Sequence, residues 1–507
     1  MVTINDMVSY CKRRGLVFPS SEIYGGISGF YDYGPIGVEI VNNIKNEWWN
    51  SIVRNNENVV GIYGTVIGNP KIWEASGHVA NFVDFLVECK KCKQKFRADH
   101  LIEDVLKLST EGMKAKEIED VIKKNNIKCP SCKGSFGNVT EFNLMFKTNV
   151  GPSGQEFAYL RPETAQTIFA DFKSVLDTSR LKLPFGIAQI GKAFRNEISP
   201  RNFLFRLREF EQMEMEFFVH PEKKDECDKF DLIKDVKVNA YTAEAQEKKG
   251  KTVSTTIAEL VKNKTIKSKW HAFWMGYRYN WFLMLGIKPE NLRLRQHVKT
   301  ELSHYATDTW DIEYNYEFGW KELEGIADRT DFDLKQHAKF SGQDLSYFNE
   351  ESKERVVPHV AAEPSVGVDR AFLTFIIDAY AEEEVKGEKR IVLKLNPKLA
   401  PYKAAVFPLV NKEGMDVKAR EVYESLRKQF ATFYDGSGSI GRRYRRMDEI
   451  GCPATITIDG QTMEDNTVTV RDRDSLKQVR VKIIELEAKL RRFLDGEKIE
   501  KVGTLIK

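Results

Sequence analysis

The sequence predicts a multidomain α+β chain. At 507 residues it exceeds the length of one ordinary domain, and its 42% apolar and 11% aromatic residues can fill sizeable cores. Strand-like and helical segments are mixed up to the break NPKLAPYK, and beyond it they alternate through residues 399–507. This alternation predicts a compact α/β module in the last part of the chain.

The net charge and the cysteine spacing limit the kinds of protein to which this sequence can belong. The formal net charge is only +4, so contact with nucleic acid has to rely on local basic patches. The opening MVTINDMVSYCKRRG lacks an apolar targeting segment, and no apolar run reaches the ~18 residues of a membrane span. We therefore expect a cytoplasmic protein without membrane contact. Two Cys-x2-Cys pairs in such a chain indicate metal thiolates rather than disulfides.

Residues 1–88 combine glycine-rich turns with one amphipathic helix. After the turn GFYDYGPIG, apolar side chains recur at the helical period. They are Val38, Ile40, Val41, Ile44, Trp48 and Ile52. The spacing predicts a helix with one buried face.

Residues 89–140 read as an insertion with a charged, helix-like middle. It opens and closes with the two cysteine pairs, Cys89 with Cys92 and Cys129 with Cys132. Four thiolates with this local spacing match a tetrahedral zinc site, and the helical excursion would absorb the long stretch between the pairs. The alternative is four reduced surface thiols.

The segment FRNEISPRNFLFRLREFEQMEMEFFV, residues 194–219, sets four arginines and five glutamates among large apolar side chains. In a strand, alternate side chains share one face. The shared face would hold Arg206, Arg208, Phe210, Gln212 and Glu214. Such a face could hold polyphosphate, stack a flat base and bind an amine. The alternative is a salt-bridged strand pair on the protein surface.

A second constellation lies in VAAEPSVGVDRAFLTFIIDAY, residues 360–380. Glu363 and Ser365 precede Gly367, and Arg370 opens an apolar helix. A glycine where strand meets helix lets a ligand approach the backbone, and the arginine adds to the positive helix end, which suits phosphate. The alternative is a capped core helix with a solvent-facing arginine.

Together these segments resemble the class II aminoacyl-tRNA synthetases. FRNE with FRLREFEQME is similar to motif 2 of that family, EPSVGVDR to motif 3, and GFYDYGPIG with the helix after it to motif 1. SSEIYGG, RPETAQ, ENLRLRQH, ELSHYATDTWDIEY and ELEGIADRTDFDL further resemble the glycyl-tRNA synthetases of the homodimeric type. The resemblance covers nearly the whole chain and implies a six-stranded antiparallel catalytic sheet with insertions and a C-terminal α/β anticodon-binding domain.

The resemblance implies an organisation in six parts. The catalytic parts are 1–88 with motif 1 and the dimer interface, 141–220 with motif 2, and 291–398 with motif 3; the others are the zinc-type insertion 89–140, a helical, Lys-rich insertion 221–290 and the anticodon-binding domain 399–507.

It also implies the activity: glycine is activated with ATP and Mg²⁺ and transferred to the 3′ end of tRNA(Gly) by a homodimer that carries a structural zinc. One rival is a class II ligase for another small amino acid such as serine, threonine or proline, but Glu214 and Glu363 crowding the ammonium argue against it. Another is a synthetase-like regulator that binds tRNA or nucleotide without catalysis. Such a protein is expected to lack Arg195 or Arg370, and both are present.

Site residues follow from the matching motifs. Catalytic roles are implied for Arg195 and Arg370. The implied ATP-binding residues are Arg195, Asn196, Glu197, Phe205, Arg206, Leu207, Arg208, Glu209, Phe210, Glu322, Leu323, Gly367, Val368, Asp369 and Arg370. The implied glycine-binding residues are Arg97, Glu163, Phe210, Glu211, Gln212, Met213, Glu214, Glu363, Pro364, Ser365, Val366 and Gly367. The metal ligands would be Cys89, Cys92, Cys129 and Cys132.

Several weaker sequence features are each compatible with two interpretations. Arg97 would contact substrate or form a local salt bridge. The run GRRYRRMDEIG, residues 441–451, would contact the anticodon stem or form a solvated helix with a tucked tyrosine. The Lys-rich stretch 248–269 would face RNA or only solvent. Phe203 stands where many relatives have glycine at the tip of the motif 2 loop.

The histidines of the matching motifs are His78, His297, His304 and His359. We expect structural, hydrogen-bonded roles for them, because the implied chemistry needs no general base.

Overall fold

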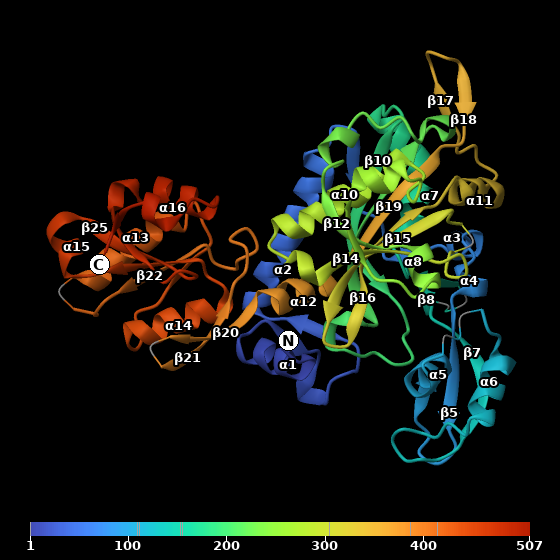
Figure 1. Cartoon of the computed structure of the whole chain (residues 1–507), viewed down its shortest axis with the longest axis horizontal. Helices are drawn as coiled ribbons and strands as arrows, with labels where there is room; N and C mark the ends of the chain where they lie inside the picture. Colours follow the sequence, from blue (N-terminus) through green and yellow to red (C-terminus); the bar gives the residue numbers. More distant parts are fainter. Residues whose placement is uncertain are drawn as a thin grey trace.

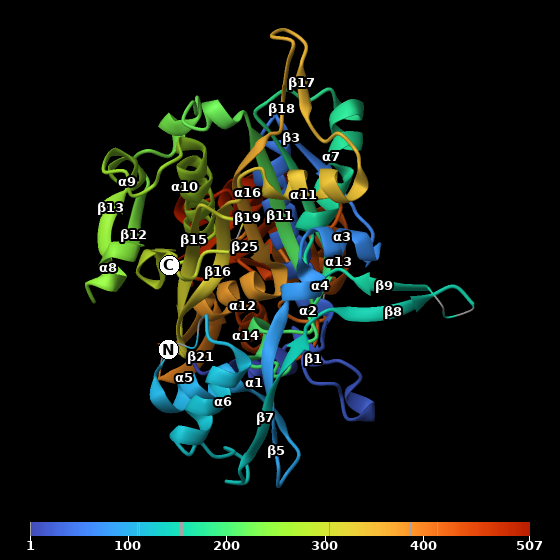
Figure 2. The ribbon, with the colours of Figure 1, turned by 90° about the vertical axis from the view of Figure 1, so that its right-hand side faces the viewer.

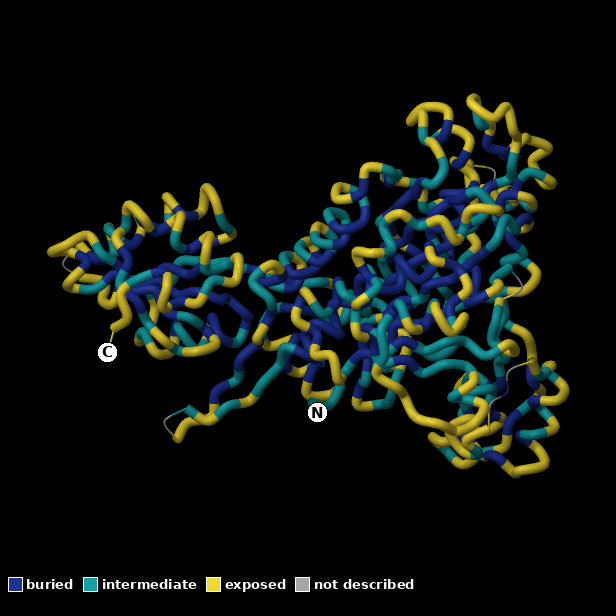
Figure 3. The backbone as a smooth tube through the Cα atoms, turned by 45° about the horizontal axis from the view of Figure 1, so that its top comes forward, coloured by how far each residue is buried: buried dark blue, intermediate teal, exposed yellow. Residues whose placement is uncertain are grey.

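The computed structural model describes residues 2–108, 110, 112–152, 154, 156–303, 305–385, 387–412 and 414–506. A large body holds most of the chain, and a smaller C-terminal unit lies beside it (Figure 1). Buried backbone runs through the interior of both parts (Figure 3). Among the described residues, no helix combines the length and the apolar character needed to cross a bilayer.

A nine-stranded sheet forms the centre of the large body. In spatial order its strands are β13 (Val253–Thr256), β12 (Lys237–Tyr241), β14 (Leu292–Gln296), β15 (Asp308–Tyr316), β16 (Gly319–Asp328), β19 (His359–Gly367), β11 (Glu209–Val219), β10 (Phe185–Phe194) and β3 (Val59–Ile62). The six strands from β14 to β10 are antiparallel throughout, as the resemblance implies. β3 adds to β10, and β12 adds to β14, in parallel.

Helices cover one face of this sheet. They are α2 (Pro35–Trp49), continued by a π-helical turn (Asn50–Arg54), α10 (Lys269–Met284) and α12 (Val368–Ala379). Met213, Met215 and Phe217 of β11 point into the core that these helices close. The alternate residues of β11, such as Gln212 and Glu214, therefore lie on the opposite face.

The opposite face is only partly covered. α7 (Ala165–Ser179) and α11 (Phe332–Ser341) pack there, and Phe169 and Phe172 of α7 join Phe218 of β11 in a second core cluster. Beyond α7 the face stays open, and the cavity described below occupies it.

The predicted N-terminal helix is α2. Ile40, Val41 and Trp48 are fully or nearly buried as expected, but Val38 is 40% exposed. The buried side of the helix instead begins at Gly37, where an added Cβ would lie 1.9 Å from the Leu16 carbonyl oxygen. A glycine was needed for this close approach, so the apolar count alone misplaced the first position of the face.

Residues 83–143 form the insertion predicted from the cysteine pairs. A three-stranded sheet of β6 (Lys95–Arg97), β5 (Val83–Cys89) and β7 (Phe136–Asn143) packs against α5 (Ala98–Leu106) and α6 (Ala115–Lys124) around a small core of its own. This unit projects from the large body (Figures 1 and 2). A second small sheet of β4 (Ile67–Gly68), β9 (Glu156–Leu160) and β8 (Phe146–Val150) carries an outward arm (Figure 2).

The expected insertion 221–290 is integrated with the catalytic sheet. β12 and β13 extend the sheet edge, and α10 is buried against β16 and β19 with Trp270 and Trp274 in the main core. The Lys-rich composition concealed this, because the exposed lysines alternate with buried residues such as Ile257, Leu260 and Ile266. The remaining short elements are α1 (Ile4–Arg13), β1 (Val17–Pro19), β2 (Tyr31–Tyr33), α3 (Pro70–Ala75), α4 (His78–Asn81), α8 (Ala243–Glu247), α9 (Ile257–Lys262), β17 (Tyr347–Asn349) and β18 (Glu354–Val356).

The C-terminal unit is the predicted α/β module. Its six-stranded sheet runs β23 (Thr432–Tyr434), β22 (Ala404–Pro408), β24 (Ala454–Ile458), β25 (Thr467–Asp472), β26 (Gln478–Lys482) and β27 (Thr504–Leu505). Its helices are α13 (Met415–Leu426), α14 (Ile440–Ile450), α15 (Gly460–Asp465) and α16 (Leu486–Leu494).

A hairpin of β20 (Tyr380–Val385) and β21 (Glu388–Leu393) joins α12 to this unit. Arg390 of β21 binds the buried carboxylate of Asp448 on α14 at 2.9 Å, and Arg471 of β25 binds the same carboxylate at 2.9 and 3.0 Å. These ion pairs fix the hairpin to the C-terminal sheet.

Candidate active site

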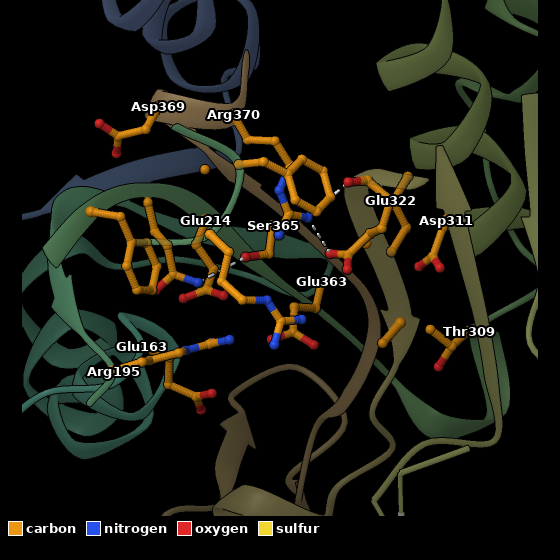
Figure 4. A pocket seen from close by; sticks show the side chains of 18 of the residues that line it. Glu163, Arg195, Glu214, Thr309, Asp311, Glu322, Glu363, Ser365, Asp369 and Arg370 are labelled. Atoms are coloured by element: carbon orange, nitrogen blue, oxygen red, sulfur yellow. Dashed lines mark hydrogen bonds and ion pairs between the residues drawn. The ribbon is translucent and has the colours of Figure 1, made fainter. Parts of the chain in front are cut away.

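The open part of the central sheet holds a cavity of about 350 Å³. Side chains from β11, β15, β16 and β19 line it, with others from the segments that flank β10 and from the start of α12. The predicted site residues that line it are Glu163, Arg195, Glu197, Phe205, Arg206, Leu207, Phe210, Gln212, Glu214, Glu322, Glu363, Ser365, Gly367, Asp369 and Arg370. Figure 4 shows Arg195 and Arg370 entering the cavity from different sides.

Other predicted site residues lie outside the lining, mostly because strand alternation turns them away. They are Arg97, Asn196, Arg208, Glu209, Glu211, Met213, Leu323, Pro364, Val366 and Val368. Met213, Leu323, Val366 and Val368 belong to the core on the helix side of the sheet. Arg97 pairs within its own insertion, with Asp84 at 2.8 Å and with Asp99.

Arg195 is held by a backbone carbonyl and two aromatic rings rather than by a protein acid. Its Nε donates to the Pro162 carbonyl oxygen at 3.0 Å, and its guanidinium lies 5.3 Å from the Phe210 ring and 5.5 Å from the Phe82 ring. Among the described residues, no carboxylate lies within 4.0 Å of this guanidinium, whereas the Arg206 guanidinium has Glu197 at 3.4 Å. The Arg195 charge is therefore available to the cavity.

Arg370 and Arg208 are anchored differently from Arg195. Arg370 donates to the Glu322 carbonyl oxygen at 2.8 Å, lies 3.3 Å from Glu322 Oε1, and stacks 4.4 Å from the Phe205 ring. Arg208 donates to the carbonyl oxygens of Glu197 and Ser28, both at 2.9 Å. Arg208 thus fixes the turn before β11 and lies outside the cavity lining, whereas Arg195, Arg206 and Arg370 belong to it.

Three carboxylates, Glu163, Glu214 and Glu363, also line the cavity (Figure 4). Burial alone would raise the pKa of Glu163, but His78, with Arg329 and Arg195, holds that pKa below its usual range. Burial raises the pKa of Glu363 to about 8 even though Arg329 opposes it. Burial and the neighbouring Glu163 also raise the pKa of Glu214.

A buried arginine that the sequence did not single out lies behind these acids. Arg329 pairs with Glu363, and through Nε and Nη2 with Asp333 at 2.9 and 3.0 Å. Burial, and then Glu363, raises the pKa of Glu216, the next acid along β11, far above its usual range. Arg329 and Asp333 both lie in the stretch IADRTDFDL that was quoted for the family resemblance. The sequence therefore pointed to this stretch, but it did not indicate that these two residues support the acids.

Two carboxylates line the part of the cavity beside Arg370. Glu322 and Asp311 both line it, and an added Cβ at Gly325 would lie 3.7 Å from Glu322 Oε1 and 3.8 Å from Asp311 Oδ1. Both carboxylates therefore lie close to Gly325, and carboxylate oxygens are donors that Mg²⁺ prefers. Burial raises the pKa of Asp311 to about 6, against its 2.8 Å contact with His297. The family resemblance implied Glu322 as a site residue but not Asp311.

The four cysteines of the insertion converge. Their Sγ atoms all lie within 4.8 Å of one another, and Cys89 lies 3.4 Å from Cys132. Both pairs use the same turn: Lys93 N–H donates to the Cys89 carbonyl, and Lys133 N–H donates to the Cys129 carbonyl. Backbone N–H groups, first that of Cys92, lower the pKa of the Cys89 thiol to about 6. This donor set suits tetrahedral Zn²⁺.

The histidines are bonded as expected. The described ones of that set, His78, His297 and His359, contact Glu163 at 3.2 Å, Asp311 at 2.8 Å and Asp328 at 2.6 Å, respectively, and His304 lies outside the described residues.

The run 441–451 forms α14 and the turn after it. Arg443 is buried against the Pro408 carbonyl, and the Tyr444 hydroxyl bonds Thr457 at 2.6 Å. Most of its polar groups therefore support the module, with Arg442 exposed. In the Lys-rich stretch 248–269, residues 248–254 are exposed, whereas Ile257, Leu260 and Ile266 are buried.

Comparisons with known proteins agree with this architecture. The family described as tRNA synthetase class II core domain (G, H, P, S and T) matches residues 146–380, and the anticodon binding domain family matches residues 403–493. A glycine–tRNA ligase from Clostridium kluyveri is 49% identical, covering 96% of this chain and 97% of that protein. Glycine–tRNA ligases from Geobacillus thermodenitrificans and Thermobifida fusca are 48% and 47% identical, each over 97% of this chain and 97% and 98% of their own length. The chain therefore belongs to the class II aminoacyl-tRNA synthetases, in the family of glycine–tRNA ligases.

Proposed function

We propose that the chain activates glycine with ATP and transfers the glycyl group to the 3′ end of tRNA(Gly), releasing AMP and pyrophosphate. The observation that carries this proposal is the cavity where Arg195 and Arg370, from separate segments, face three buried carboxylates. The likeness to glycine–tRNA ligases over almost the whole chain supports the same substrates.

ATP would lie along the arginine side of the cavity. Arg195 would hold the α-phosphate and stabilise the charge that develops there, while Arg370 would restrain the outer phosphates. Phe210 would stack the adenine ring, with Glu197 near its amino group. Arg208, anchored on two carbonyl oxygens, would act on the phosphates chiefly by holding this turn in place.

Glycine would lie on the carboxylate side. Its ammonium would meet Glu163, Glu214 and Glu363, with Ser365 Oγ beside them. A pocket cannot select the smallest amino acid by filling space with a side chain, so it excludes larger ones and grips the ammonium. Acids packed around the Cα perform both tasks.

The reaction needs alignment more than proton transfer. The ionised glycine carboxylate attacks the α-phosphorus and pyrophosphate leaves, so no general base is required for this step. The terminal ribose hydroxyl of tRNA then attacks the carbonyl carbon and displaces AMP. Class II membership supports attack by the 3′-hydroxyl.

Glu322 would hold Mg²⁺ with help from Asp311. When bound there, the ion would neutralise charge between phosphate oxygens. Arg370 and Arg195 hold the pKa of Glu322 below its usual range despite burial, so this ligand stays ionised.

The four-cysteine cluster would hold a structural zinc that stabilises the insertion near the acceptor end of tRNA. Residues 399–507 would bind the anticodon. We also infer a homodimer: β3 is the edge strand of the sheet, and the adjoining Tyr63 and Ile67 are 87% and 53% exposed, which supports a protein partner there. A cytoplasmic location follows from the use of charged tRNA in protein synthesis.

Amino-acid-dependent exchange of pyrophosphate into ATP tests the proposal. Glycine should drive exchange, while alanine, serine, threonine and proline should not. If serine or alanine drove exchange and glycine did not, the glycine assignment would be wrong. Sedimentation and metal content measured on the same sample test the dimer and the zinc.

A further inference from the structure

We propose that His78 and Gln166 are positioning residues for glycine, because they hold the Glu163 carboxylate in the orientation in which it meets the ammonium. This inference rests on the proposed function, in which Glu163 is one of three acids at that ammonium. Neither His78 nor Gln166 lines the cavity, so both would act on the substrate through Glu163.

Glu163 is held at both carboxylate oxygens by donors from different elements. His78 Nε2, from the first residue of α4, lies 3.2 Å from Oε2. Gln166 Nε2, from the first turn of α7, donates to Oε1 at 3.1 Å. The side chains of His78 and Glu163 are only 13% and 16% exposed, so water competes weakly for these contacts.

The Ser76 hydroxyl can pair with His78 Nδ1 in either charge state while Nε2 carries a proton. Its Oγ lies 2.8 Å from His78 Nδ1 and 3.4 Å from the Trp73 carbonyl oxygen. In a neutral ring, the ionised Glu163 carboxylate favours the tautomer with the proton on Nε2, and the hydroxyl then donates to Nδ1. With a charged ring, Nδ1–H donates to the hydroxyl, which turns to the carbonyl. Nε2–H faces Glu163 in both states.

The rest of the His78 surroundings is rigid. The ring sits edge-on between Trp73, at 5.6 Å, and Phe82, at 5.4 Å. Phe82 in turn faces the Arg195 guanidinium at 5.5 Å. The segment that places His78 therefore also borders the arginine assigned to the α-phosphate.

Gln166 is fixed as firmly. Its Nε2 also donates to Asp333 Oδ1 at 3.0 Å, and its Oε1 lies 2.9 Å from His337 Nε2. Asp333 binds Arg329, which pairs with Glu363. Two of the three acids are thus tied to one buried network.

Such holding matters because three carboxylates that share a cavity repel one another. A terminal carboxylate torsion is broad, so an unheld Glu163 would turn away from its neighbours. Each carboxylate oxygen accepts more than one hydrogen bond, so Oε1 and Oε2 can still meet an ammonium while held from behind. The lowered pKa of Glu163, to which His78 contributes, agrees with a carboxylate kept ionised for this contact.

The test separates glycine binding from ATP binding by pyrophosphate exchange. His78→Ala should raise the KM for glycine about 10- to 100-fold, the loss expected for a hydrogen bond to a charged group, with the KM for ATP within about twofold. His78→Gln keeps an Nε2 donor and should recover most of that loss. Gln166→Met, close in volume but without a donor, should raise the same KM and serves if His78→Ala does not fold. His220→Gln is the matched control, because His220 pairs with the exposed Glu354 and should leave both constants unchanged.

A purely structural role for His78 would lower thermal stability and shift both constants together, which would overturn the inference. An unchanged KM for glycine in both His78→Ala and Gln166→Met, beside normal exchange by the unmodified chain, would overturn it as well while leaving the proposed function standing. No glycine-dependent exchange by the unmodified chain would overturn both.

Discussion

Replacing Arg195 by alanine gives the sharpest test of the proposed chemistry. Its guanidinium makes one hydrogen bond to the protein, from Nε to the Pro162 carbonyl oxygen, and two ring contacts. Loss of that bond costs about 1 kcal/mol of folding stability, which leaves the chain folded. The charge itself has no carboxylate within 4.0 Å among the described residues, so what the substitution removes is mostly a contact with ligand.

The kinetic cost should be far larger than the structural one. Deleting one preorganised donor at developing charge typically costs about 2.7–4 kcal/mol, which is about 10²- to 10³-fold in rate. Arg195→Ala should therefore lower glycine-dependent exchange by that factor while tRNA binding and the melting temperature change little. Arg195→Lys keeps the charge but lacks the planar guanidinium, so its exchange rate should lie between those of the unmodified chain and Arg195→Ala. Exchange within threefold of the unmodified chain in Arg195→Ala, measured at saturating ATP and glycine, would remove Arg195 from the α-phosphate.

Four further predictions address the acids, the metal and the C-terminal unit. Because burial raises the pKa of Glu363 to about 8, the KM for glycine should rise by up to about tenfold per pH unit as the pH falls below about 8, and Glu363→Gln should show a higher KM without this dependence. The same raised pKa means that the native state binds a proton which the unfolded chain has released, so stability of the ligand-free protein should fall as pH rises toward about 8, as thermal melts will show. Cys92→Ser should release bound zinc and expose the insertion to limited proteolysis, whereas Cys227→Ser, a half-buried cysteine outside the cluster, should do neither. Asp448→Ala strands two buried guanidinium groups and should lower the unfolding free energy by about 3–5 kcal/mol, while Glu487→Ala at an exposed ion pair should change it by less than about 0.5 kcal/mol in calorimetry.

Strand periodicity predicted the site where a strand forms and failed where it does not. Phe210, Gln212 and Glu214 share the cavity face as expected, because β11 begins at Glu209. The residues before it include a 3₁₀ turn, so the same alternation could not place Arg208, which turns to backbone carbonyls instead. The boundary of the strand, not the pattern inside it, limited the prediction.

The sequence could not predict which residues from distant segments contact one another at the site. Arg329, Asp311 and Phe82 reach the site only because the chain folds three separate segments around one cavity. Nothing in the local spacing of each marks which acid or ring it will meet. The resemblance named many of the residues that line the cavity, whereas the residues that hold them in place required coordinates.

Phe203 shows how a local departure can be accommodated. Its φ is +56°, in the left-handed region that favours glycine, and the family resemblance placed glycine there in many relatives. The side chain is nonetheless 7% exposed, and its ring packs edge-on 5.1 Å from Tyr31. Buried aromatic contact thus offsets the backbone strain, and the motif 2 loop keeps its turn with a bulkier tip.

The acidic side chains of β11 differ in their partners: some form ion pairs with lysine, and Glu214 does not. Glu209 and Glu211, on the side away from the cavity, have Lys192 at 3.3 Å and Lys45 at 3.2 Å. Glu214, on the cavity face, has no lysine or arginine within 4.0 Å among the described residues and accepts a hydrogen bond from the Thr164 hydroxyl instead. A hydroxyl orients the carboxylate without cancelling its charge. The alternation of the strand therefore separates the acids that pair with lysine from a cavity-facing acid that has no cationic side chain within 4.0 Å among the described residues.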